Sequence, residues 1–266
     1  MSTCKIEMPS RVHSVSWADA VLTAVLAALV LLAWWSLWLW SRSPQGHLLL
    51  HGFAHLKMAG VNRLHFALIA TGGWTLMTVA MMLPTSVPLL VVFRRVVSGH
   101  ATAWLLAVVI FGYLAVWALA GAGLQLVSWL LQEGANRILW PAAAPWIGSA
   151  AILTIAGLYQ FSPLKYVCLE KCRSPLSFLI AHWRGGNESL QALRLGSAHG
   201  VFCVGCCWSL MLLMFIVGVG SLSAMLGLGS MMALEKNFRW GRRLSTPLGM
   251  LLLVGAGAAL VAGIRA

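Results

Sequence analysis

Long apolar runs separated by short polar and basic stretches make up most of the chain. A helix needs about 20 apolar residues to cross the hydrocarbon core of a bilayer, so runs of that length predict membrane-spanning helices. Five such runs are Asp19–Trp40, Leu64–Phe93, Thr102–Leu131, Pro145–Phe161 and Pro247–Ile264. The first is too long and too rich in tryptophan for the core of a signal peptide, and we interpret it as a membrane anchor.

One further apolar stretch is too long for a single span. Gly200–Leu234 contains thirty-five residues without a charge, and as one helix it would be ~52 Å long. Glycines and serines in Gly218–Ser223 weaken a helix, so we expect the chain to break there and double back. A half-buried helix pair inside the bundle is the alternative, because the second arm is short. The pattern predicts an all-α, polytopic transmembrane helix bundle of six or seven spans, with a broken or hairpin segment at Gly200–Leu234.

Composition and charge agree with a membrane location. The chain is 60% hydrophobic and 9% charged, whereas soluble domains are roughly 25% charged. Its eighteen Lys and Arg residues lie between apolar runs, which excludes nucleic acid as a partner and leaves the lipid bilayer. If the chain doubles back, thirteen basic residues lie in segments on the cytoplasmic side of the membrane and five lie on the opposite side. Lys165 and Lys236 are among the thirteen. This asymmetry is the one that the positive-inside rule predicts. We expect a cytoplasmic tail over residues 1–18 and a single integral membrane domain over residues 19–266.

Five of the six cysteines fall in two tight groups. Cys168 and Cys172 form the first, and Cys203, Cys206 and Cys207 form the second, and each spacing places the thiols on one helical face. Thiolates select Cu(I), Zn or iron–sulfur clusters, so a four-thiolate site is sterically feasible. The alternatives are a disulfide and buried thiols that behave as small apolar side chains.

Methionine and histidine add further ligands. Three methionines precede Pro84, where a proline bends a membrane helix and often marks a site, and one methionine and one histidine flank the second cysteine group. Thioethers beside thiolates favour Cu(I), whereas zinc uses Cys, His and carboxylate ligands. Methionines that only fill the core are the alternative. The predicted metal site consists of Cys168, Cys172, Cys203, Cys206, Cys207, Met77, Met81, Met82, Met211 and His199.

Other polar residues carry weaker signals. His47, His51 and His55 form a stripe on the side opposite the cysteines, which is either a loading or sensing surface or an interfacial helix. Glu170 and Glu235 are expected to be solvated end residues or ion-pair partners, with a secondary role as metal or proton ligands. The chain has six acidic residues and no Ser-His-Asp arrangement, HExxH motif or paired intramembrane carboxylates, so we predict that it is not an enzyme.

Five strings together carry a family resemblance: Ala80–Pro84, Leu158–Lys165, Cys168–Pro175, Gly200–Met211 and Glu235–Lys236. Over Thr71–Leu248 the chain resembles a prokaryotic family of predicted metal-binding integral membrane proteins, which includes a membrane protein regarded as the copper chaperone of a bacterial tyrosinase. By similarity, the positions that match the family's pattern are Met81, Met82, Cys168, Cys172, Cys203, Cys206, Cys207, Met211 and Glu235.

Residues and resemblance together predict a multi-pass protein of a prokaryotic cytoplasmic membrane that binds a soft transition metal. Cu(I) is the expected metal and zinc the second. The metal is delivered to a copper-dependent enzyme or other membrane subunit, or is moved across the bilayer. A non-catalytic assembly or structural subunit is the alternative, and a thiol redox protein is a third reading, because Cys203 and Cys206 have dithiol spacing.

Overall fold

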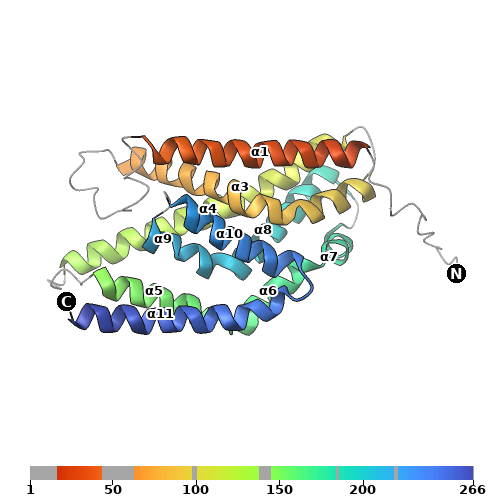
Figure 1. The fold of residues 1–266 in the computed structure, drawn as a ribbon. Coiled ribbons are helices and arrows are strands. Elements are labelled where there is room, and N and C mark those ends of the chain that lie inside the picture. The colour runs from red at the N-terminus through yellow and green to blue at the C-terminus, as the bar shows by residue number, and fades with distance from the viewer. Residues whose placement is uncertain are drawn as a thin grey trace.

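The structure, a computed structural model, describes residues 17–43, 63–97, 101–137, 145–183, 186–218 and 221–265. Within these ranges every regular element is a helix, and the helices form an elongated bundle (Figure 1). The predicted all-α helix bundle is therefore confirmed. Cys4, nearly all of the predicted tail, and the stripe of His47, His51 and His55 lie outside the described residues.

Five helices in these ranges are long and apolar enough to cross a membrane. They are α1 (Trp17–Ser41), α3 (Arg63–Val96), α4 (Thr102–Arg137), α8 (Glu188–Leu212) and α11 (Ser245–Arg265). Large apolar side chains such as Leu32 on α1 and Leu251 on α11 are exposed, as expected of surfaces that face lipid.

The predicted fourth span is bent. α5 (Pro145–Tyr159) and α6 (Pro163–Arg173) meet at 64°, and if the pair crosses as one span the number of spans is six. Ser162 begins α6, because its hydroxyl accepts a hydrogen bond from the Leu164 amide at 3.2 Å, and the proline that follows suits a helix start. After the bend α6 packs against α8 and leads into α7 (Pro175–His182).

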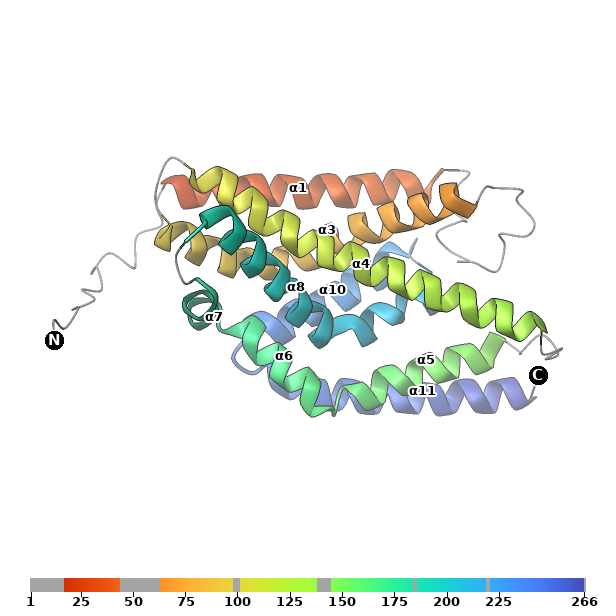
Figure 2. The same ribbon diagram turned by 180° about the vertical axis from the view of Figure 1, so that it is seen from behind.

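The chain doubles back within Gly200–Leu234, as the hairpin prediction requires. α8 ends at Leu212, α9 (Met214–Val217) follows, and Gly218 has a φ of 89°, which glycine adopts without strain. α10 (Leu222–Asn237) then runs in the direction opposite to α8 and packs against α3 (Figure 2). Its sixteen residues are fewer than the about 20 of a full crossing, so α10 is a shortened arm inside the bundle. A short 3-10 turn, η2 (Gly241–Leu244), joins it to α11.

A proline shapes α3 where this helix meets the cysteines. Pro84 has no amide hydrogen, so the Ala80 carbonyl loses its helical donor, and the Trp34 indole of α1 donates to it at 3.2 Å. The Thr85 hydroxyl donates to the Met82 carbonyl at 2.8 Å. The indole thus satisfies the carbonyl that Pro84 leaves without a helical donor, and the helix continues to Val96.

Candidate metal site

α8 presents three cysteines to the centre of the bundle. Cys203, Cys206 and Cys207 are each at most 1% exposed and belong to the larger apolar core. The Cys206 and Cys207 thiols donate to the Cys203 carbonyl at 3.1 and 2.8 Å, which satisfies these weak donors within the helix. The thiols therefore lie in the interior of the protein.

α6 brings the other two cysteines against α8. Cys172 Sγ lies 4.0 Å from Cys206 Sγ, and Cys172 is only partly buried. The Cys168 thiol lies over the backbone of Gly205, where an added Cβ would be 2.6 Å from the sulfur. Glycine at this position thus permits the close approach of α6 to α8. All five cysteines in the described residues are free thiols.

α3 contributes a thioether to the same region. Met82 is fully buried, and its Sδ lies 3.7 Å from Cys207 Sγ. Met77, Met81 and Met211 are buried in the same core cluster. Met81 lies next to α10, because its side chain is 3.6 Å from the Cβ position of Gly229.

A lysine from the end of α10 lies among these sulfur atoms. Lys236 is 6% exposed, and its Nζ donates to Cys203 Sγ at 2.9 Å and to the Thr85 hydroxyl at 3.3 Å. The same Nζ is 3.8 Å from Met82 Sδ and 3.9 Å from Cys207 Sγ. Sequence reasoning placed Lys236 among the loop charges and missed this position. The one available signal was a charged pair at the end of an otherwise apolar arm.

Cys203, Cys207 and Met82 together are called the sulfur cluster below, and His199 lies beside this cluster and not within it. Its Nε2 is 3.2 Å from the Ser86 hydroxyl, and its ring stacks on Tyr113 at a centroid distance of 5.6 Å. Tyr113 makes the contact to the cluster, because its hydroxyl is 3.1 Å from Cys203 Sγ. Tyr113 is a second residue that sequence reasoning missed.

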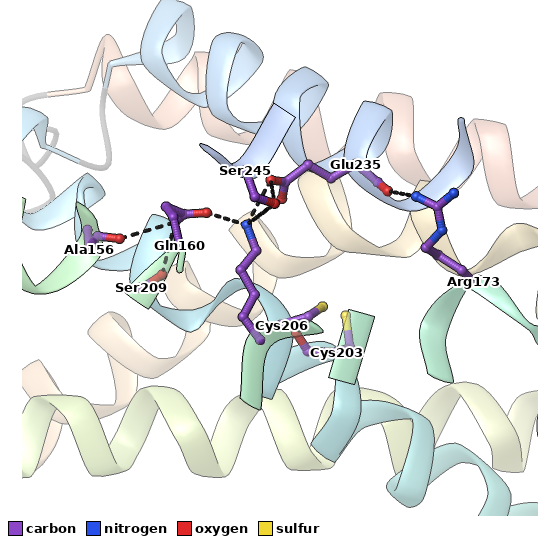
Figure 3. Close-up of polar contacts among 9 residues, drawn as sticks. Ala156, Gln160, Arg173, Cys203, Cys206, Ser209, Glu235 and Ser245 are labelled. Carbon is purple, nitrogen blue, oxygen red and sulfur yellow. Dashed lines mark hydrogen bonds and ion pairs between the residues drawn. The ribbon is translucent and has the colours of Figure 1, made fainter. Parts of the chain in front are cut away.

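A buried ion pair joins α6, α10 and the start of α11 next to this region (Figure 3). Lys165 is fully buried, and its Nζ donates to both carboxylate oxygens of Glu235 at 2.7 and 3.0 Å. The Gln160 side-chain oxygen and the Ser245 hydroxyl accept from the same Nζ, and Ser245 also donates to Glu235 at 2.7 Å. Arg173 donates to the Glu235 carbonyl at 2.6 Å. The expectation of Glu235 as an ion-pair partner is confirmed, whereas the assignment of Lys165 to a loop is wrong, because the carboxylate and these hydrogen bonds allow its charge to be buried.

The sulfur atoms form pairs between helices and do not close into a four-thiolate site. Cys172 pairs with Cys206 across α6 and α8, and Cys207 pairs with Met82 across α8 and α3. Among the described residues, no group of three or more His, Cys, Asp or Glu side chains is arranged to hold a metal ion. Pairs of thiol and thioether ligands are suited to a soft monovalent ion, and a closed tetrahedral set is suited to zinc.

A comparison with protein families gives one match, to a family model described as PpoB2, copper chaperone, over residues 71–259. The matched region runs from α3 into α11 and contains both cysteine groups, Met82 and the buried ion pair. No curated protein and no solved structure matches the chain.

Proposed function

The chain belongs to the PpoB2 family of copper chaperones, and on this premise we propose that it binds Cu(I) through buried sulfur ligands and passes it on. The receiver is a copper-dependent enzyme or another membrane subunit, or the ion is moved across the bilayer. The protein is a carrier in this proposal and not an enzyme, and copper is its cargo. The proposed location is a prokaryotic cytoplasmic membrane.

The contact between Cys207 and Met82 carries the proposal. Their sulfur atoms lie 3.7 Å apart, although the residues belong to different helices and are 125 positions apart in the sequence. Both sulfur types are soft ligands that favour Cu(I) over harder divalent ions. Pro84 lies two residues beyond Met82 within α3, so the thioether lies beside a proline inside a membrane helix, where membrane proteins often build sites.

A second sulfur pair supports stepwise transfer. Cys172 and Cys206 lie 4.0 Å apart, and Cys172 is partly exposed whereas Cys206 is buried. An ion that enters at Cys172 can therefore exchange one soft ligand for the next as it moves inward. Ligand exchange of this kind does not require a closed four-coordinate site, which would hold the ion as a structural zinc site does.

Copper content of the purified protein tests the proposal. We expect wild-type protein to retain Cu(I), and the triple variant C203S/C206S/C207S to lose most of it, because serine is a poor ligand for Cu(I). The single variant M82L keeps the side-chain volume and removes the thioether, so it is expected to bind Cu(I) more weakly while it folds normally. Equal copper in wild type and triple variant would refute the proposal.

Burial of the cysteines favours a second candidate, a non-catalytic assembly subunit of a membrane complex. Cys203, Cys206 and Cys207 pack with apolar side chains such as Leu210 in one core cluster, as small apolar residues do. This candidate predicts stable co-purification with a large partner that survives the cysteine-to-serine changes with function intact. Loss of function together with loss of copper would exclude it.

A further inference from the structure

The Lys236 ammonium lies where three sulfur-bearing side chains from two helices meet. Its Nζ is 2.9 Å from Cys203 Sγ, 3.8 Å from Met82 Sδ and 3.9 Å from Cys207 Sγ. These are the side chains that the proposed function assigns to the cargo. A cation of the protein itself thus lies among the sulfur ligands.

This placement is unusual for a buried cation. A charge removed from water is normally paired with an opposite charge, as Lys165 is with Glu235. Within the described residues no carboxylate forms an ion pair with Lys236, and its hydrogen bonds go to sulfur atoms and to the Thr85 hydroxyl. The sulfur cluster therefore provides most of the surroundings that accept its positive charge.

The backbone that bears Lys236 is held in place. The preceding residue, Glu235, is fixed through its carboxylate by Lys165 and through its carbonyl by Arg173. Movement of Lys236 can therefore be limited to its own four-carbon side chain, which is flexible. The backbone at position 236 is thus fixed, and the ammonium group at the end of the side chain can move.

We propose that the Lys236 ammonium occupies the cation position of the empty site and is exchanged for a single monovalent soft cation when the site is loaded. This inference rests on the proposed function and adds to it a reason why the site would prefer a monovalent ion. In this exchange the Cys203 sulfur, which accepts from the ammonium, is a thiolate paired first with Lys236 and then with the incoming ion, whereas the Cys207 thiol and the Met82 thioether are neutral. No proton is released, and the charge of the buried cluster stays the same. A divalent ion in the same exchange would add one unit of positive charge to this region of low dielectric constant and is disfavoured.

Metal competition with a neutral residue at position 236 tests the exchange. Full-length protein in detergent is titrated with Ag(I), a monovalent soft ion, and with Cd(II), a divalent one, against a chelator of known affinity. The K236M variant keeps the length of the side chain and removes the ammonium. We expect its Ag(I) affinity to rise by about tenfold or more, because a hydrogen bond to a charged group commonly contributes that much. The affinity for Cd(II) should rise further, so that the preference for Ag(I) falls.

A matched control and a second variant make the result decisive. Lys171 on α6 is exposed, so K171M removes the same charge from the surface and is expected to bind both ions as the wild type does. The K236Q variant repeats the test with a polar neutral side chain, should K236M fold poorly. Unchanged or weaker Ag(I) binding in the neutral variants would overturn the exchange. Absence of Ag(I) and Cu(I) binding in wild type and all variants would instead refute the proposed function, and the inference with it.

Discussion

At the scale of single residues, the pair of Lys165 and Glu235 determines how α10 can end inside the bundle. The pair is at most 2% exposed, and neither charge could remain in this interior alone. Glu235 lies two residues before Asn237, where α10 ends, and directly precedes Lys236. The ion pair thus fixes the residue beside the movable lysine, and its loss should affect both folding and the site.

Removal of one partner should be far more damaging than removal of both. E235L leaves Lys165 as an unpaired buried charge, and we expect a loss of ~3–5 kcal/mol in the free energy of unfolding. The double variant K165M/E235L removes both charges and should recover most of that loss. Thermal denaturation in detergent, with K165M to complete the cycle, measures the coupling. Additive losses would show that the two residues do not act as a pair.

Sequence reasoning correctly placed three cysteines on one helical face and gave Lys165 the wrong environment. The spacing of Cys203, Cys206 and Cys207 is enough to place them on one face of a helix, and the structure does so. Whether Lys165 lies in a loop or in the core depends on a partner seventy residues away. A local sequence pattern does not show which distant residue will become the partner. A charged residue near the end of a span is therefore assigned to a loop by default.

At the scale of helices, α4 and α8 cross so closely that only glycine fits between them. A Cβ at Gly196 would lie 2.1 Å from the Val109 carbonyl oxygen of α4. Small residues allow this backbone approach in membrane proteins, where van der Waals contact between helices drives association. The crossing holds α8, and with it the cysteines, at a fixed distance from Tyr113 on α4.

The variant G196A should therefore push α4 and α8 apart. Because the obstacle is backbone and not a flexible side chain, we expect a loss of roughly 1–3 kcal/mol or more. G123A on α4 is the matched control, since nothing lies within 4 Å of a Cβ there, and it should be neutral or stabilising by up to ~1 kcal/mol. Equal midpoints of thermal denaturation for the two variants would contradict this account of the crossing.

The apolar runs predict most of the long helices, but they predict less well how the helices bend and pack against one another. Run length predicts α1, α3, α4 and α11, because each must match the thickness of the bilayer. The 64° bend between α5 and α6 and the packing of α6 on α8 are not encoded in run length. They depend on close approaches such as that of Cys168 to Gly205, which a single sequence does not reveal.

At the scale of the whole molecule, the return of α10 sets which end of the bundle receives the basic residues. The turn after α10 lies toward the same side of the bundle as the C-terminal end of α3 (Figures 1 and 2). The segment after α10 contains Arg239, Arg242 and Arg243, and the last turn of α3 contains Arg94 and Arg95. Charge counting from the sequence had favoured the doubled-back chain for the same reason. Charge counting and the helix directions therefore agree on the hairpin, although the first uses no coordinates.

The hairpin makes an unambiguous topological prediction for the two ends of α11. A reporter fused after Leu244 should lie in the cytoplasm with the basic residues, and one fused after Arg265 should lie on the opposite side, because one spanning helix separates the two positions. Green fluorescent protein reports the first location and alkaline phosphatase the second. If α8 to α10 instead crossed the membrane once, both fusions would report the reverse, and the clustered charges of η2 would face outward against the positive-inside rule. A fluorescent fusion at Arg265 together with a phosphatase-active fusion at Leu244 would thus reject the hairpin. It would also place the Lys236 end of the sulfur cluster on the outer side of the membrane.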